Sequence, residues 1–221
     1  MVERLLDSMI LGPSAKRFYT LFALAFITAC SSREVIVDGS FPTPLVDPVP
    51  VSLGVVFTPE FRKHQLVDDA TGRGEVSWSV STGVAQVEFW STLLPAFFQN
   101  VVFIESYDDL ETYDVDAVFV PEIADVQYAI PLYTNVKVYE IWMRYRFELL
   151  TPDATPVAEW DMSSYGKTPT AFLQSDQEAV NLAAVMALRD AGANFATTFT
   201  RIAPIQAWLQ AQNVPAPGAG P

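Results

Sequence analysis

The sequence predicts an α+β fold: a two-layer sandwich in which a mostly antiparallel sheet of four to five strands packs against two main helices. Three observations support this class. Apolar and polar residues alternate along 135–149, apolar residues recur at helical spacing along 83–99, and a helix-start signal stands at 175–178. A chain of 221 residues that is 50% hydrophobic can form one core of ordinary size, and we expect the folded domain to occupy residues 51–212.

The first half of this domain reads as strand, helix, strand. Residues 51–57 are rich in β-branched and apolar side chains and end before Thr58-Pro59, which predicts a buried strand. A polar connection, 60–69, follows. Residues 83–99 predict a helix that Pro95 kinks or ends, and 100–105 return to strand character. The expected buried face of the helix consists of Val84, Val87, Trp90, Leu94 and Phe97 or Phe98.

The second half predicts further strands, which complete the order β-α-β-β-β-β-α. Residues 114–130 form the third strand, with Pro121 as a break or bulge. The longest alternation, 135–149, predicts a long antiparallel strand, and the turn residues of 151–156 send the chain back along 157–165 as a hairpin. On the first hairpin strand, Tyr139, Ile141, Met143, Tyr145, Phe147 and Leu149 alternate with Glu140, Trp142, Arg144, Arg146 and Glu148.

The last part of the domain predicts helices. Ser175 and Glu178 match a capping box, in which a hydroxyl and a carboxylate satisfy free amides at a helix start. The alanine-rich helix that follows is expected to reach Ile202, and Pro204 is expected to begin a short final helix. Residues 213–221, rich in proline, glycine and alanine, have the composition of a disordered tail.

The amino-terminal segment carries the features of an export signal. Lys16-Arg17 precede an apolar run that ends in small residues before the chain's one cysteine, Cys30. The run has about twelve residues, fewer than the roughly 20 needed to span a bilayer, so we expect residues 1–29 to be a cleaved signal peptide. Four prolines then predict that 30–50 is an extended tether.

The four residues around the expected cut, Ile27-Thr28-Ala29-Cys30, resemble the lipobox of bacterial lipoproteins. The resemblance implies cleavage before Cys30 and acylation of its thiol, including palmitate, which would anchor the chain to a membrane. Ser31 and Ser32 in place of an aspartate imply the periplasmic face of the outer membrane, by similarity to enterobacterial lipoproteins. The alternative is an ordinary signal peptide with an incidental cysteine.

The chain offers few residues for catalysis or metal binding. Its formal net charge of −13 disfavours nucleic acid as a partner. The one histidine, His64, could act as an acid or base beside Asp68 or Asp69, or could simply be a loop residue. The acidic run 108–116 could suggest calcium, but it lacks the spacing and central glycine of an EF-hand and fits a solvated connection better. We therefore expect no enzyme activity, no cofactor and no metal.

The polar face of the predicted hairpin is the best candidate for partner binding. Arg144 and Arg146 are expected to form cross-strand pairs with acidic residues there. Trp142 and Trp160 are expected near them, and exposed tryptophan beside arginine is typical of interface anchors. The alternative is that a second helix packs on these tryptophans.

The lipobox, the tether and the element order together resemble small periplasmic lipoproteins that serve envelope machines. The phrases VSLGVVFTPEFR, from Val51, and VYEIWMRYRFELLTPDATPVAEWDMSSYGK, from Val138, carry this resemblance. The group includes the lipopolysaccharide-assembly lipoprotein, the ring lipoprotein of Pel export, and the penicillin-binding-protein activator, whose domain is similar to the amino-terminal domain of TolB. The resemblance implies a non-catalytic accessory component of an envelope transport or biogenesis complex, anchored by lipid and able to form homo-oligomers. The alternative is a periplasmic binding protein or hydrolase acting on a cell-wall or lipid ligand near His64.

Overall fold

A computed structural model describes residues 32–69, 76–106, 110, 112–131, 138–169 and 175–212. The expected signal peptide 1–29, Cys30 and the tail 213–221 lie outside these residues. One compact unit of the chain begins at Arg33.

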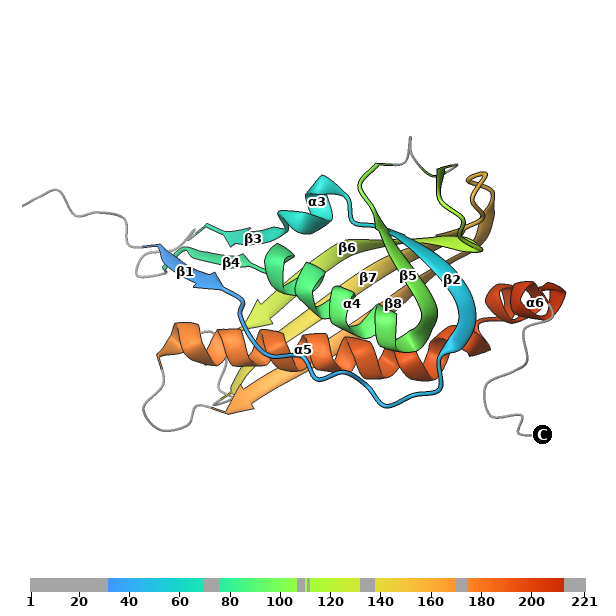
Figure 1. Ribbon diagram of the computed structural model, residues 1–221. Helices are drawn as coiled ribbons and strands as arrows, with labels where there is room; N and C mark the ends of the chain where they lie inside the picture. The colour runs from blue at the N-terminus through green and yellow to red at the C-terminus, as the bar shows by residue number, and fades with distance from the viewer. Residues whose placement is uncertain are drawn as a thin grey trace, which may run out of the picture. The chain divides into compact units, whose positions relative to one another are not determined.

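The centre of the fold is a five-stranded sheet with the order β5-β2-β6-β7-β8 (Figure 1). Its strands are β2 (Val49–Val56), β5 (Phe98–Ile104), β6 (Ala117–Ala129), β7 (Val138–Leu150) and β8 (Pro156–Pro169). The last three are antiparallel neighbours, as predicted. However, β2 runs parallel to both β5 and β6, so the sheet is mixed. β5 can run parallel to β2 because the chain between them, which includes α4, returns to the same end of the sheet before β5 begins.

Two helices, α4 (Gly83–Phe97) and α5 (Asp176–Thr198), cover one face of this sheet (Figure 1). The α+β class is therefore confirmed. The hydroxyl half of the predicted capping box is present, because the Ser175 hydroxyl accepts a hydrogen bond from the Glu178 amide at 3.1 Å. Beyond α5 the chain tightens into a 3₁₀ turn, η2 (Phe199–Arg201), and then forms α6 (Ala203–Ala211).

The buried face of α4 includes Trp90, Leu94 and Phe97, as predicted, but differs from the prediction at Val84. Val84 is 71% exposed, whereas Phe89 and Leu93, outside the predicted stripe, are buried. Pro95 lies inside the helix, which continues to Phe97. The difference arises because α4 has apolar residues around most of its circumference, so spacing alone did not select the side that packs.

The region predicted as a tether belongs to the fold from Arg33 onward. Strand β1 (Arg33–Ile36) pairs in parallel with β4 (Trp78–Ser81), and β3 (Gln65–Asp68) completes a second sheet with the order β1-β4-β3. After β1, the Asp38 amide donates to Asn181 Oδ1 at 2.9 Å, and Asn181 Nδ2 donates back to the Asp38 carbonyl at 3.0 Å. The predicted boundary at residue 51 is therefore about 18 residues late, because prolines between 42 and 50 masked the apolar alternation before them.

The polar connection predicted at 60–69 also has regular structure. It contains α3 (Pro59–Arg62), which the Thr58 hydroxyl caps, and β3. Phe61 of α3 is buried and stacks on Phe57, with ring centroids 5.3 Å apart.

The main core lies between the five-stranded sheet and the helices. Trp90 of α4 is at its centre and makes edge-to-face contacts with Phe147 at 5.3 Å and Phe195 at 5.2 Å. A smaller apolar cluster lies on the opposite side of the sheet, where Leu110 and Val115 cover Val118 and Ile104. The helices therefore cover one face of β7 and β8, and side chains on the other face of β7 are partly or fully exposed.

Candidate functional site

The outer face of the β7-β8 hairpin carries the residues that the alternation predicted. Tyr139, Ile141, Met143, Tyr145, Phe147 and Leu149 of β7 are buried against the helices. Trp142 lies on the opposite face and is 40% exposed, and Arg144 beside it is exposed. The second helix that could have covered this tryptophan does not occur among the described residues.

Trp160 does not belong to this face. It pairs with Phe147 across the hairpin, and its ring lies 5.2 Å from that of Phe147 and 6.0 Å from that of Phe199, so it packs on the core side. The prediction that Trp160 lies beside Trp142 on the polar face was therefore wrong. Tyr165 occupies the place opposite Trp142, with ring centroids 5.4 Å apart.

The sequence analysis missed Tyr165, although a signal for it exists. Tyr165 is an even number of residues from Glu159 and Asp161 of the same strand and an odd number from Trp160, so alternation places it on the face of the two acidic residues. Extending the same parity four residues further along β8 places Tyr165 on the outer face. Its hydroxyl donates a hydrogen bond to Glu140 Oε1 at 2.5 Å, and this bond raises the pKa of Tyr165.

The two arginines of the hairpin have different surroundings. Arg146 lies within 3.5 Å of carboxylate oxygens of Glu122 and Glu159 and 3.7 Å from Asp161. The predicted cross-strand pairs are therefore present for Arg146. Arg144 forms no ion pair within the described part of the chain, so its guanidinium is available for a charged or polar partner.

A shallow open depression lies beside Trp142 and Arg144. It has a volume of about 490 Å³ and is lined by Asp125, Gln127, Trp142, Met143, Arg144 and Ser163. Gln127 Nε2 donates to Asp125 Oδ2 at 2.8 Å, which holds both polar side chains on the rim. An aromatic surface next to a guanidinium and a carboxylate is suited to binding, and this lining contains no nucleophile paired with a base.

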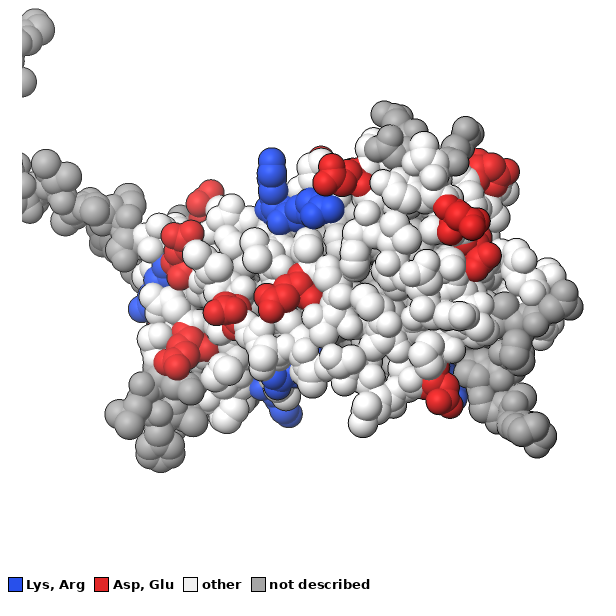
Figure 2. Space-filling model, viewed as in Figure 1, with Lys and Arg blue, Asp and Glu red and all other residues white. Residues whose placement is uncertain are grey.

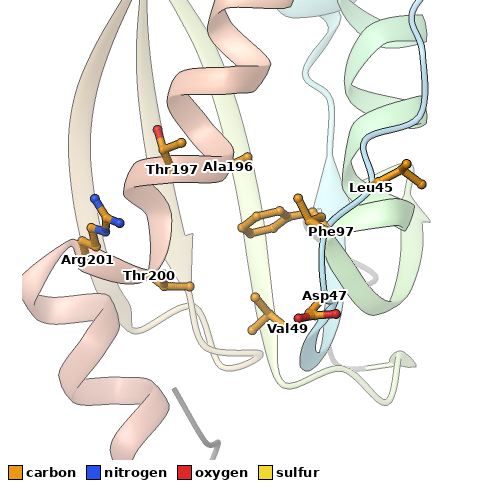
Figure 3. Close-up of a pocket in the computed structure, with 9 residues that line it drawn as sticks. Leu45, Asp47, Val49, Phe97, Ala196, Thr197, Thr200 and Arg201 are labelled. Carbon is orange, nitrogen blue, oxygen red and sulfur yellow. The ribbon is translucent and has the colours of Figure 1, made fainter. Parts of the chain in front are cut away.

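A second hollow lies between segment 45–49 and the end of α5 (Figure 3). Its volume is about 710 Å³, and its lining consists of Leu45, Val46, Asp47, Val49, Phe97, Ala196, Thr197, Thr200 and Arg201. Asp47 and Arg201 are the charged residues of this lining, and the apolar side chains come from both walls. The volume lies within the range of about 300–1,000 Å³ that is usual for small-molecule sites.

His64 and Asp68 do not form one cleft. They stand at the two ends of the extended strand β3, so their backbones are separated by roughly 13 Å at about 3.3 Å per residue. His64 Nδ1 is 2.7 Å from the Thr82 hydroxyl, while Asp68 Oδ2 accepts a hydrogen bond from Tyr128 at 2.5 Å. Burial lowers the pKa of His64. Both side chains therefore have separate structural partners.

The acidic run lies partly outside the described residues, since Asp108, Asp109 and Glu111 are among those not described. Asp116 ties the loop to β2, because its carboxylate accepts from the Ser52 amide and its own amide donates to the Ser52 carbonyl, both at 2.8 Å. Within the described ranges no three His, Cys, Asp or Glu side chains are grouped to hold a metal ion. No helix among the same residues is both long and apolar enough to cross a membrane.

Comparison with known proteins gives structural likenesses at low identity. No family model and no curated protein sequence matches the chain. A Xanthomonas campestris protein of family DUF330 is 14% identical over 79% of this chain and 99% of its own, with a TM-score of 0.48. Uncharacterized lipoprotein B from Nitrosomonas europaea is 14% identical over 79% of this chain and 97% of its own, with a TM-score of 0.40. The PelC dodecamer from Paraburkholderia phytofirmans is 15% identical over 69% of this chain and 99% of its own, with a TM-score of 0.30.

These similarities, all below 25% in identity and 0.5 in TM-score, assign no family. The resemblance to accessory lipoproteins of particular envelope machines remains a prediction. The function proposed next therefore rests on the residues of this chain.

Proposed function

We propose that the chain is a lipid-anchored, non-catalytic accessory protein of the bacterial envelope that docks onto a protein complex through the outer face of its hairpin. The docking face consists of Asp125, Trp142, Arg144 and Tyr165. Acylation of Cys30 at the periplasmic face of the outer membrane supplies the anchor. The observation that carries the proposal is the exposed Trp142-Tyr165 pair beside an arginine that has no ion pair in the described part of the chain.

The chemistry of this face favours a protein partner. Trp, Tyr and Arg dominate the binding energy of protein interfaces because they combine large apolar area with a polar group. Burying the exposed part of Trp142 contributes apolar area, and Arg144 can pair with a carboxylate without first losing an ion-pair partner of its own. Arg146, held among three carboxylates, is a poorer anchor because its charge is already compensated.

The anchor is tested by intact mass spectrometry of the full chain, expressed with its own leader in a Gram-negative host and extracted from membranes. The expected species begins at Cys30 and carries a diacylglyceryl group and an amide-linked acyl chain. The control Cys30→Ala should lose the acyl mass and leave the membrane fraction. An unmodified thiol or an uncleaved leader in the native chain contradicts the proposal.

Docking is tested by placing a photo-crosslinking residue at Gln127, on the rim of the depression beside Trp142, in the exported chain and, as a matched control, at Met186, which is 47% exposed on α5. A discrete heavier adduct is expected from position 127 alone. Arg144→Glu should weaken that adduct at least about tenfold because it reverses the charge at the interface. Lys63→Glu makes the same charge change at an exposed side chain after α3, away from the docking face, and should leave the adduct unchanged. Equal crosslinking from both positions contradicts the proposal.

The hollow of Figure 3 favours a second candidate function, the binding of a lipid ligand between segment 45–49 and α5. Its apolar walls suit an acyl chain, and Arg201 suits an acidic headgroup. Ala196→Trp fills the hollow and should abolish binding of a fluorescent fatty acid, whereas Val84→Trp on the exposed side of α4 should not. If the chain as isolated binds no fatty acid, this candidate is excluded.

A further inference from the structure

We propose that two copies of this chain pair through the free edge of β5, which joins their five-stranded sheets into one continuous sheet. The pairing uses a different surface from the docking face and does not require the anchor. Two features support it: α5 obstructs the edge at β8 but not the edge at β5, and β5 carries side chains that suit pairing with another strand.

The edge at β8 is closed by α5. Asp190 Oδ2 accepts a hydrogen bond from the Tyr165 amide at 3.0 Å, and Asn194 Nδ2 donates to the Ser163 carbonyl at 3.2 Å. These are backbone groups of β8 that a further strand would need. The helix also approaches β8 so closely at Gly166 that an added Cβ would lie 2.0 Å from the Ala183 carbonyl oxygen. These contacts block the addition of a strand along Ser163–Gly166 of β8.

The edge at β5 has no such cover. β5 pairs with β2 on one side, and its other side has no hydrogen-bonded neighbour in the described part of the chain. In a parallel pair every second residue turns its amide and carbonyl away from the neighbour, so about half of the seven residues offer free backbone groups. The strand can be followed beside β2 in Figure 1.

The sequence of this edge lacks the usual protection against pairing. Natural edge strands carry charged side chains, proline or a bulge that blocks an incoming strand. The strand Phe98–Ile104, FQNVVFI, contains no charged residue and no proline. The irregularity in its pairing with β2 lies at its start, opposite Val49–Ser52, and the register from Asn100 to Ile104 is regular. Figure 2 likewise shows no Lys, Arg, Asp or Glu over β5 on the face in view. The edge is therefore chemically open to another strand.

An aromatic side chain stands rigidly at this edge. Phe103 is 41% exposed, and its inner side stacks on Phe57 with ring centroids 5.7 Å apart. Phe57 in turn stacks on Phe61 of α3. Because the stack already restricts Phe103, a partner can cover its exposed part at little cost in conformational entropy.

The pattern of the strand fits a second copy. In an antiparallel pairing centred on Val102, Val101 faces the partner's Phe103, and the two Val102 side chains face each other on the opposite side of the sheet. Val101 and Phe103 both point to the helix side, so each two-fold related pair joins an aromatic and a β-branched residue, which is a favourable cross-strand combination. No charge opposes a like charge within the strand. Because α5 obstructs the other edge of the sheet at Ser163–Gly166, we expect the pairing to end at a two-fold dimer and not to continue into a fibre.

The test uses the full chain with its native anchor, purified in detergent. Sedimentation analysis should give a dimer that strengthens as salt is raised, because screening reduces the repulsion between two chains that both carry an excess of acidic residues. Phe103→Lys should raise the dissociation constant at least about tenfold, since it places two like charges at the pairing edge. Val84→Lys adds the same charge at a side chain that is 71% exposed on α4 and should leave the dimer intact.

A second variant reports the pairing directly. Val102→Cys introduces a thiol opposite its own copy, and oxidation should link two chains, whereas Val84→Cys should not react at a comparable rate. Circular dichroism of each variant checks that it folds. Three results overturn the proposal: a chain that stays monomeric at all salt concentrations, a dimer insensitive to Phe103→Lys, or a Val102→Cys variant whose new thiol forms its disulfide mainly with a different protein.

Discussion

Substitution of Gly166 by alanine should separate α5 from β8 and strongly destabilise the fold. An added Cβ would lie 2.0 Å from the Ala183 carbonyl oxygen and 2.3 Å from the Ala187 amide nitrogen, whereas ordinary contacts begin near 3.4 Å. Both atoms are helix backbone, so α5 as a whole must withdraw by more than about 1 Å. Overpacking of this kind costs about 1–3 kcal/mol, and we expect the upper end of this range because the withdrawal also stretches the two hydrogen bonds from α5 to the edge of β8.

Urea unfolding followed by circular dichroism measures this loss. A decrease of about 3 kcal/mol in the free energy of unfolding corresponds to a melting temperature lower by roughly 6–12 °C for a chain of this length. Gly54→Ala is the matched control in the same sheet, because its Cβ would meet the Ile104 Cδ1 atom at 2.7 Å, the far end of a side chain that can rotate away. The control should lose less than about 1 kcal/mol. Equal losses for the two variants would refute the close backbone approach at Gly166.

Three further predictions concern titration and charge. Burial lowers the pKa of His64, so NMR titration of this single imidazole should give a value below 6.5. Below pH 6.5 the unfolded chain therefore takes up a proton at His64 more readily than the folded chain does, and the fold loses stability as pH falls. His64→Gln should remove this loss. Burial raises the pKa of Tyr145 above its ordinary 10.0, so the free energy of unfolding should fall by about 1.4 kcal/mol per pH unit as pH rises above 10. In urea titrations at alkaline pH, Tyr145→Phe should show a smaller fall. Tyr145→Phe also leaves the buried Gln86 without the hydroxyl that donates to it at 3.0 Å, which should cost about 1–2 kcal/mol at neutral pH. Arg146→Met should lower the free energy of unfolding by at most about 1 kcal/mol at low salt. The loss should be smaller at high salt, where repulsion among the three carboxylates around Arg146 is screened. A larger loss at high salt would contradict an electrostatic role for Arg146.

The residues of the docking face were predicted from the sequence only in part. Alternation along β7 correctly separated Trp142 and Arg144 from the buried residues, because neighbouring side chains on a strand point to opposite faces regardless of the rest of the fold. The partner strand was harder, since the face of Trp160 depends on the hairpin register. That register includes an irregularity between Leu149 and Leu150, and a slip of one residue moves a whole strand's side chains to the other face. In the structure, Tyr165 and not Trp160 therefore lies beside Trp142 on the outer face.

The start of the folded domain was predicted too late for a different reason. Prolines between 42 and 50 favour an extended chain, and the sequence analysis extended this conclusion back to Cys30. The structure instead buries Val35 and Val37 and ties Arg33 to Asp176 of α5. These contacts join residues 143 positions apart, a separation over which no local pattern carries information.

The sequence by itself determined the α+β class, the long hairpin and the capped start of α5. Each of these depends on the direction of side chains a few residues apart, which covalent geometry sets within the segment. Only the tertiary structure decided that β2 lies between two parallel neighbours, that α5 closes the edge at β8, and that β5 and Trp142 remain open. Which edges and side chains stay exposed depends on what distant segments cover, because burial is a property of the assembled layers and not of any one strand.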